Sequence, residues 1–505
     1  MFKKYFLFTA IFLATCSSVE DVPLPITSTS EKAVEFFNKA VYHVEQGEWN
    51  EGKNNFQSAL RIDPNFVMAN LWGWSEDPIQ NRKLTETAIS NKDKASDAER
   101  LRVEMMMAGR EGDQATRLKL AEELVEKYPN SSESYEVLAD MYREQYKLDD
   151  AIANYDKALK INPDNFRVHA QIAQLHVVTG QNILLPKERQ SKDIAIKHAE
   201  EMIRIRPKAP FAHQIRANIE RADSNFEEAI KLYQNLVDVC NETGSTAKGT
   251  ALLISGHNLM FSGRFDDAMR TYDEAISIAN TPQTAFNYNR FKVHAHLFDN
   301  KYYEALDLLD EMLKNVGESS ASKEAVINNT ANIYWNKIMI QAHNQQKKEA
   351  FESLDQWKKY RKTNLDAVNK EDFQQRRVDG YNASNYATEA WINVLFGEYE
   401  RASSLLDKHY EIAKNWKNVA ALDGYSGLYG MVYVMQGNPE KALDYFGDRI
   451  TPSNNIYYSY FKALALKAIG RADEANGIFE YIANFNFLGW EPGLTRNLSI
   501  NELKS

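Results

Sequence analysis

The residue types most often used in catalysis and metal binding occur here without the spacing that such chemistry needs. Among ten histidines, His294 and His296 lie two positions apart, so on a helix they point about 200° away from each other and do not easily share a metal. Gly424, Gly427 and Gly430 superficially suggest a nucleotide-binding loop, but the required spacing and a preceding strand are missing. Gly430 is better explained as a small residue that lets two helices pack closely.

Other signatures of enzymes are also missing from the sequence. It contains no P-loop, no HExxH, no CxxC and no Gly-Xaa-Ser-Xaa-Gly elbow. The acidic pairs Asp149-Asp150 and Asp266-Asp267 precede helical patterns, where they are explained as N-terminal capping and dipole partners. The sequence therefore predicts a protein that is not an enzyme and that uses no cofactor and no metal.

Composition indicates a helical protein with an acidic surface. The 505 residues are 44% apolar, with only 22 glycines and 13 prolines, and the net charge is −10. Low glycine and proline contents suit helices. The negative charge argues against a general affinity for nucleic acid or anionic lipid.

A small residue followed four places later by an aromatic residue or leucine recurs with a period of about 34 residues. Both members of such a pair lie on one helix face. The pairs are Ala151/Tyr155, Ala229/Tyr233, Ala268/Tyr272, Ala305/Leu309, Ala350/Leu354, Ala402/Leu406, Ala442/Phe446 and Ala475/Phe479. A fixed period of this kind predicts a solenoid, in which neighbouring units complete each other's core.

The repeat resembles the tetratricopeptide repeat. The first unit carries that family's small, aromatic and proline positions as Ala40, Gly47, Trp49, Gly52, Phe56, Ala59 and Pro64. The best match is residues 132–165, and eleven units are recognisable within 32–484. The resemblance implies an all-α fold, a right-handed superhelical solenoid of antiparallel helix pairs, with helix A of each unit on the concave face.

Four segments break the repeat. Residues 67–97 read as a degenerate helix pair, and insertions lie near 181–190, 315–330 and 361–382. Insertions in repeat proteins fall on loops, often at an edge of the binding face, so these are candidate partner contacts or simply longer corners. Residues 485–505 are expected to form a C-terminal cap or tail.

The N-terminus is predicted to be an export signal. Residues 1–15 combine Lys3 and Lys4 with a short apolar run, too short to span a bilayer stably. Leu13-Ala14-Thr15-Cys16 resembles the lipobox of bacterial lipoproteins, from which it departs at Thr15. We expect lipidation of Cys16, with ordinary cleavage or a retained anchor as alternatives. Residues 16–31 are predicted to be a disordered tether.

The tetratricopeptide phase assigns residues to the concave groove. The predicted partner-binding residues are Gln214, Asn218, Arg221, His257, Arg290, His294, Trp335, Met339 and Trp391. Aromatic, Met and Arg side chains are typical of binding hot spots. The alternative is a superhelix that coils tightly enough to bury this strip against itself.

Together these features predict a non-catalytic protein–protein interaction scaffold of the bacterial cell envelope. The resemblance to tetratricopeptide lipoproteins implies an exported, outer-membrane protein that contacts the membrane only through its lipid anchor. Its expected partner is a segment of another envelope protein, and no nucleic acid is expected. The alternative function is binding of a glycan or small molecule on Trp and Tyr platforms in the C-terminal half.

Overall fold

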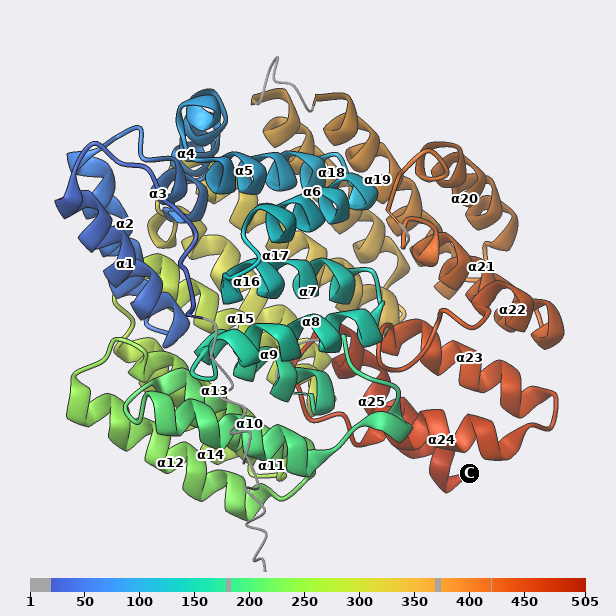
Figure 1. Cartoon of the computed structure of the whole chain (residues 1–505). Helices are drawn as coiled ribbons and strands as arrows, with labels where there is room; N and C mark the ends of the chain where they lie inside the picture. Colours follow the sequence, from blue (N-terminus) through green and yellow to red (C-terminus); the bar gives the residue numbers. More distant parts are fainter. Residues whose placement is uncertain (1–19, 179–182, 368–373, 419) are drawn as a thin grey trace, which may run out of the picture.

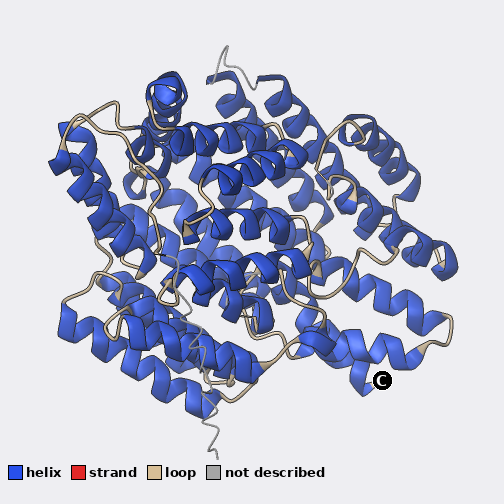
Figure 2. Ribbon diagram, in the orientation of Figure 1, coloured by secondary structure: helices blue, strands red, loops and turns tan. Residues whose placement is uncertain are grey.

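The computed structural model describes residues 20–505 apart from 179–182, 368–373 and 419. Throughout this part of the chain the regular structure is helical, and no strand occurs in it (Figure 2). The predicted all-α solenoid of antiparallel helix pairs is confirmed. The predicted signal peptide, residues 1–15, and Cys16 lie outside the described residues.

Consecutive helices pair along the described chain, and each pair is one structural unit (Figure 1). The pairs are α1 (Glu31–Glu45) with α2 (Trp49–Ile62), α3 (Val67–Trp72) with α4 (Pro78–Asn91), α5 (Asp97–Arg110) with α6 (Gln114–Lys127), α7 (Ser132–Glu144) with α8 (Leu148–Ile161), α9 (Phe166–His176) with α10 (Lys192–Ile205), α11 (Pro210–Ala222) with α12 (Phe226–Thr243), α13 (Lys248–Phe261) with α14 (Phe265–Ser277), α15 (Pro282–Phe298) with α16 (Tyr302–Ser319), α17 (Lys323–His343) with α18 (Lys347–Ala367), α19 (Gln374–Leu395) with α20 (Tyr399–Ala413), α21 (Asp423–Met435) with α22 (Pro439–Phe446), and α23 (Ile456–Ala468) with α24 (Ala472–Ala483). A final helix, α25 (Trp490–Lys504), follows them.

The small and large residues of the repeat do the packing that their spacing predicts. Ala151 and Tyr155 of α8 are fully buried, and the Tyr155 hydroxyl donates to Asp140 of α7 at 2.6 Å. A β-carbon at Gly430 would lie 2.4 Å from the Phe446 ring, so only glycine lets α21 and α22 approach this closely. The three glycines of 424–430 therefore belong to a packed helix and not to a nucleotide loop.

The superhelix winds back against itself. The amide of Phe211 donates to the carbonyl of Gln46 at 2.9 Å, which joins the start of α11 to the end of α1. Further along, α4 contacts α17 and α25 contacts α15 and α17. Because successive turns touch, much of the inner wall faces other helices of the same chain.

One interruption of the repeat is the helix pair that the sequence predicts, whereas two others differ from the expected loops. Residues 67–97 form the short pair α3 and α4 and a 3-10 turn. The insertion near 315–330 was expected to be a loop, but it lengthens α16 and α17, and most of 361–382 lengthens α18 and α19. The expectation of loops was wrong at these two places, because the added residues continue the hydrogen bonds of existing helices. Of 181–190, the described part includes the buried Leu184 and Leu185.

Residues 20–30, here called the N-terminal segment, are docked on the solenoid. The prediction of a disordered tether is wrong for this part of 16–31. Leu24 of the segment is buried, and hydrogen bonds hold Asp21 to Ser132 and Thr29 to Asp63. It runs as an extended chain along the first units (Figure 1). Residues 16–19 lie outside the described part.

Candidate functional site

The predicted groove residues divide into buried and half-buried sets. The buried ones are Asn218, Arg221, His257, Met339 and Trp391, and the half-buried ones are Gln214, Arg290, His294 and Trp335. The buried set is covered by other helices of the chain, so the expectation that these five line an open groove is wrong. The alternative in which the superhelix packs against itself describes them correctly.

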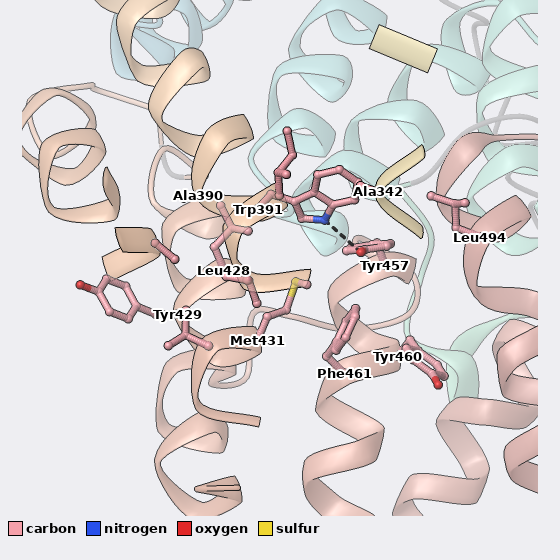
Figure 3. Close-up of a cluster of buried hydrophobic side chains, with 14 of the residues drawn as sticks. Ala342, Ala390, Trp391, Leu428, Tyr429, Met431, Tyr457, Tyr460, Phe461 and Leu494 are labelled. Carbon is pink, nitrogen blue, oxygen red and sulfur yellow. Dashed lines mark hydrogen bonds between the residues drawn. The ribbon is translucent and has the colours of Figure 1, made fainter. Parts of the chain in front are cut away.

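Trp391 shows how the strip is covered. Its indole N–H donates to the Tyr457 hydroxyl at 2.9 Å, across from α19 to α23 (Figure 3). His343 also contacts that hydroxyl, at 2.8 Å, and burial lowers the pKa of His343 to about 4. Met339 and Met431 belong to the same buried cluster. Trp391, Tyr457 and the residues packed on them therefore form a core.

Arg221 is buried because the segment between α24 and α25 packs against it. Its guanidinium lies 4.2 Å from the ring centroid of Phe487 and 5.7 Å from that of Tyr233. The Asn486 side chain donates to the Arg221 carbonyl at 3.0 Å. Desolvation lowers the pKa of Arg221 and that of His257. The hydrogen bond between Asn486 and Arg221 joins residues 265 positions apart in the sequence.

The first accessible site is a cavity of about 530 Å³, here called the N-terminal cavity. Its walls are α1, α3, α5, α7, the start of α9 and residues 23–26 of the N-terminal segment. Trp72 lines this cavity, and two guanidiniums lie over its indole ring, that of Arg102 at 5.2 Å and that of Arg167 at 5.9 Å from the ring centroid. Aromatic and charged side chains alternate around this wall.

The N-terminal cavity is lined by five carboxylates and three arginines. The ion pairs are Arg167 with Glu136 at 2.8 Å, Arg102 with Glu133 at 2.6 Å, and Arg206 with Glu45 at 2.8 Å. Burial raises the pKa of Glu136 to about 7, since desolvation outweighs the attraction of Arg167. The excess of carboxylates makes this wall suited to cationic groups.

The N-terminal segment closes one side of this cavity with its own polar contacts. The Asp21 carboxylate accepts from the Ser132 amide at 2.8 Å and from the Asn162 side chain at 2.9 Å. The Val22 amide donates to the Asn130 carbonyl at 3.0 Å. At the far end the Thr29 amide donates to the Asp63 carboxylate at 2.8 Å. The edge of the first units therefore holds an extended polypeptide segment.

The second site is a more open cleft of about 810 Å³, here called the Trp335 cleft. It lies between α4 and the helices α17, α18 and α19. Trp335 and Trp357 pack with ring centroids 5.3 Å apart, and the Arg361 guanidinium lies 4.2 Å from the Trp357 ring and 5.2 Å from that of Tyr381. Trp335, predicted from the groove phase, is half-buried, as is Tyr381, whereas Trp357 is buried.

The two long insertions meet at the Trp335 cleft. Glu324 and Asn328 come from the insertion near 315–330, and Arg361, Asn364 and Tyr381 come from 361–382. Sequence reasoning marked both insertions as candidate contacts but did not place them together. It missed Trp357, because this residue is on helix B and outside the concave phase.

The residues of the N-terminal cavity were missed for a related reason. Trp72, Arg167 and Glu136 come from units that the sequence describes as polar or degenerate. The signal that could have found them is the set of three arginines and neighbouring acids near the starts of the A helices.

Two further kinds of site do not occur among the described residues. No group of three or more His, Cys, Asp or Glu side chains there is arranged to hold a metal ion. Within the same residues no helix is both long and apolar enough to cross a membrane. Cys240 is buried, and burial raises the pKa of its thiol to about 12.

Comparison with known proteins places the repeats in a family. Residues 139–180 match the family model of the TPR repeat. The mitochondrial import receptor subunit TOM70 of Mus musculus and that of Homo sapiens are each 25% identical over 138 residues. The aligned region covers 27% of this chain, which spans about a fifth, 21%, of the length of those relatives.

Two solved structures align at low similarity. A tetratricopeptide repeat protein from Parabacteroides merdae aligns with 59% of this chain and 98% of its own, at 15% identity and a TM-score of 0.33. Naa15/Naa10 bound to HypK-THB aligns over 94% of this chain and 80% of the other chain, at 11% identity and a TM-score of 0.24. The match over residues 139–180 and the helix pairs described above show a helical solenoid that contains a tetratricopeptide repeat.

Proposed function

We propose that the chain is a protein–protein interaction scaffold that holds an extended segment of a partner beside the N-terminal cavity. The repeats support an interaction role, since solenoids of this kind present long surfaces to other proteins. The proposed partner is an envelope protein. The TOM70 relatives are named as import receptor subunits, which is consistent with recognition of other proteins.

The observation that carries the proposal is the docking of the N-terminal segment. The wall formed by the ends of α2, α5, α7 and α8 already holds an extended chain through backbone and side-chain hydrogen bonds. Ser96 contributes by donating to the Pro25 carbonyl at 2.7 Å. A wall that already holds one extended segment through such contacts is suited to a second extended segment beside it.

The charge of the cavity indicates which kind of partner segment it can bind. Five carboxylates and three arginines line the cavity, and because Glu136 is partly protonated near pH 7 and Asp164 pairs with Arg204, the lining carries only a small negative charge. A partner segment carrying Lys or Arg fits this charge best. Trp72 and Phe166 add aromatic rings to the lining, and arginines of this chain already lie over both of them.

The envelope setting is proposed on the lipobox-like motif alone. If Cys16 carries the lipid, only three residues separate it from Glu20, where the described chain begins. The membrane would then lie close to the edge that bears Asp21, instead of at the end of a long tether. Metabolic labelling with a fatty-acid analogue tests this, since label should enter the wild-type chain and not Cys16→Ala.

Site-specific photocrosslinking in intact cells tests the partner surface. A photoreactive residue replaces Asn38, which is exposed on α1 and lines the cavity. The matched control replaces Asn54, an exposed asparagine on α2 that does not line the cavity. The proposal predicts a discrete crosslinked protein from Asn38 and none from Asn54. Equal labelling at the two positions would contradict it.

A further inference from the structure

We propose that the Trp335 cleft is a second binding site, independent of the partner surface, and that it takes a short acidic saccharide. The class of ligand follows from three features of the cleft. These are an open aromatic ring, a lining of amides and hydroxyls, and an excess of arginine over carboxylate.

The cleft is built by departures from the regular repeat. The short pair α3–α4 brings α4 against α17, where Arg82 and Glu324 form a two-point ion pair. The insertions lengthen α17, α18 and α19 beyond the ordinary repeat, and those added turns supply the cleft walls. At about 810 Å³ its size is in the range of small-molecule sites.

Its aromatic floor is arranged as a layered stack. Tyr381 and Trp357 enclose the Arg361 guanidinium, and Trp335 packs on Trp357 with the ring planes 32° apart. Trp357 is buried in this stack, whereas Trp335 keeps part of its surface open to the cleft. A flat, partly exposed indole beside polar groups suits the C–H face of a sugar ring, which is apolar while its edge is polar.

The remaining lining both donates and accepts hydrogen bonds. Four asparagines line the cleft, together with the hydroxyls of Ser384, Thr388 and Tyr381. The Asn364 amide nitrogen donates to Asn328, and the buried amide oxygen of Asn364 has no partner. A buried acceptor without a donor is costly, and a ligand hydroxyl would satisfy it. Sugar hydroxyls, which donate and accept, match amides of this kind.

The lining of the cleft contains more arginine than carboxylate. Three arginines and one glutamate line it, in a protein whose net charge is −10. Glu324 is engaged by Arg82. Arg361 donates to the Asn385 side-chain oxygen at 2.9 Å, and within the described residues no carboxylate pairs with it. A carboxylate on the ligand would supply the missing counter-charge.

These features favour a saccharide over a peptide. A peptide bound in extended form is held by main-chain hydrogen bonds, as the N-terminal segment is at Asn130. The Trp335 cleft offers side-chain groups from helices, whose backbone groups already bond within those helices. An acidic peptide is the alternative ligand, so the titration includes one as a probe.

Titration of the full-length chain, followed by calorimetry and tryptophan fluorescence, tests the site. The probes are tri-galacturonate, the neutral maltotriose and an acidic tripeptide, Asp-Glu-Asp. We expect tri-galacturonate to bind at least tenfold more tightly than maltotriose, and binding to weaken as salt is raised. Tighter binding of the tripeptide, equal binding of both sugars, or no sugar binding would each overturn the proposal.

Matched variants place the ligand in the cleft. Trp335→Ala should weaken tri-galacturonate at least tenfold, whereas Trp49→Ala, at an exposed tryptophan of the first unit, should not change it. Arg361→Gln should remove the preference for the acidic sugar. Because Arg361 also packs on aromatic rings, the exposed Asn332→Asp provides a second variant that adds a negative charge to the lining and should weaken only the acidic sugar. Unchanged binding in Trp335→Ala and Asn332→Asp would place the ligand elsewhere and refute the inference.

Discussion

The N-terminal cavity and the Trp335 cleft are built from the same kind of helix pair but differ in charge and in cover. The first is lined by an excess of carboxylates and closed on one side by residues 23–26. The second is lined by an excess of arginines and lies open beside α4. The difference shows that a repeat supplies the frame, whereas its irregular segments decide what each part of the inner wall can bind.

The comparison also separates aromatic residues that form the core from those open to a ligand. Trp335 and Trp391 were assigned to one strip by their phase in the repeat. Trp391 is 6% exposed and bonded to Tyr457, whereas Trp335 keeps an open face in the cleft. The same phase therefore has two outcomes, and the difference depends on whether another helix of the chain covers the position.

The largest expected effect on stability tests whether Trp391 belongs to the core and Trp335 does not. Trp391→Ala should lower the free energy of unfolding by about 3–5 kcal/mol, because it empties a packed site and leaves the Tyr457 hydroxyl without its donor. Trp335→Ala should cost about 1 kcal/mol or less, since the ring is already part-exposed. Urea unfolding followed by circular dichroism measures both. Equal losses would show that Trp335 is also part of the core.

The next effect concerns the buried acid of the N-terminal cavity. The pKa of Glu136 is about 7 in the folded chain, above its ordinary value of 4.5, so the folded state holds a proton that the unfolded state has released between these values. Stability should therefore fall as pH rises from about 4.5 to about 7, by roughly 1–3 kcal/mol.

Glu136→Gln should flatten that part of the stability profile, measured by urea unfolding from pH 4.5 to 8. Glu126→Gln, at an exposed position of α6, is the control and should keep the wild-type slope. If Glu136→Gln keeps the slope as well, the acid is not desolvated in the way the cavity implies.

A smaller effect tests the cover of the N-terminal cavity. Asp21→Ala removes the acceptor of the Ser132 amide and of the Asn162 side chain, which should weaken docking of the segment by about 1–2 kcal/mol. Proteinase K should then cut between residues 20 and 30 faster than in the wild type. Glu20→Ala, at an exposed neighbour, is the matched control and should leave the cleavage rate unchanged.

The sequence predicted the repeat unit well, because each unit is fixed by contacts between neighbours. The unit that matches the repeat best, residues 132–165, begins at the first residue of α7. The pair Ala151 and Tyr155 is buried as its spacing indicates. Local periodicity contains enough information for these features.

The groove could not be predicted in the same way, because its cover comes from distant parts of the chain. The contacts of Gln46 with Phe211 and of Arg221 with Asn486 depend on the summed curvature of many units. Neither contact can be recognised from the period of the repeat in the sequence. The docking of the N-terminal segment was missed because its polar, proline-containing composition is also that of a linker.

The most direct test of the account is hydrogen exchange at the amides of Val22 and Thr29. In the structure these amides donate to the Asn130 carbonyl and to the Asp63 carboxylate. We predict that both exchange at least tenfold more slowly than in an unstructured peptide of the same sequence. Exchange at the rate of the free peptide would show that the segment is a loose tether, and would contradict the claim that the chain covers its own N-terminal cavity.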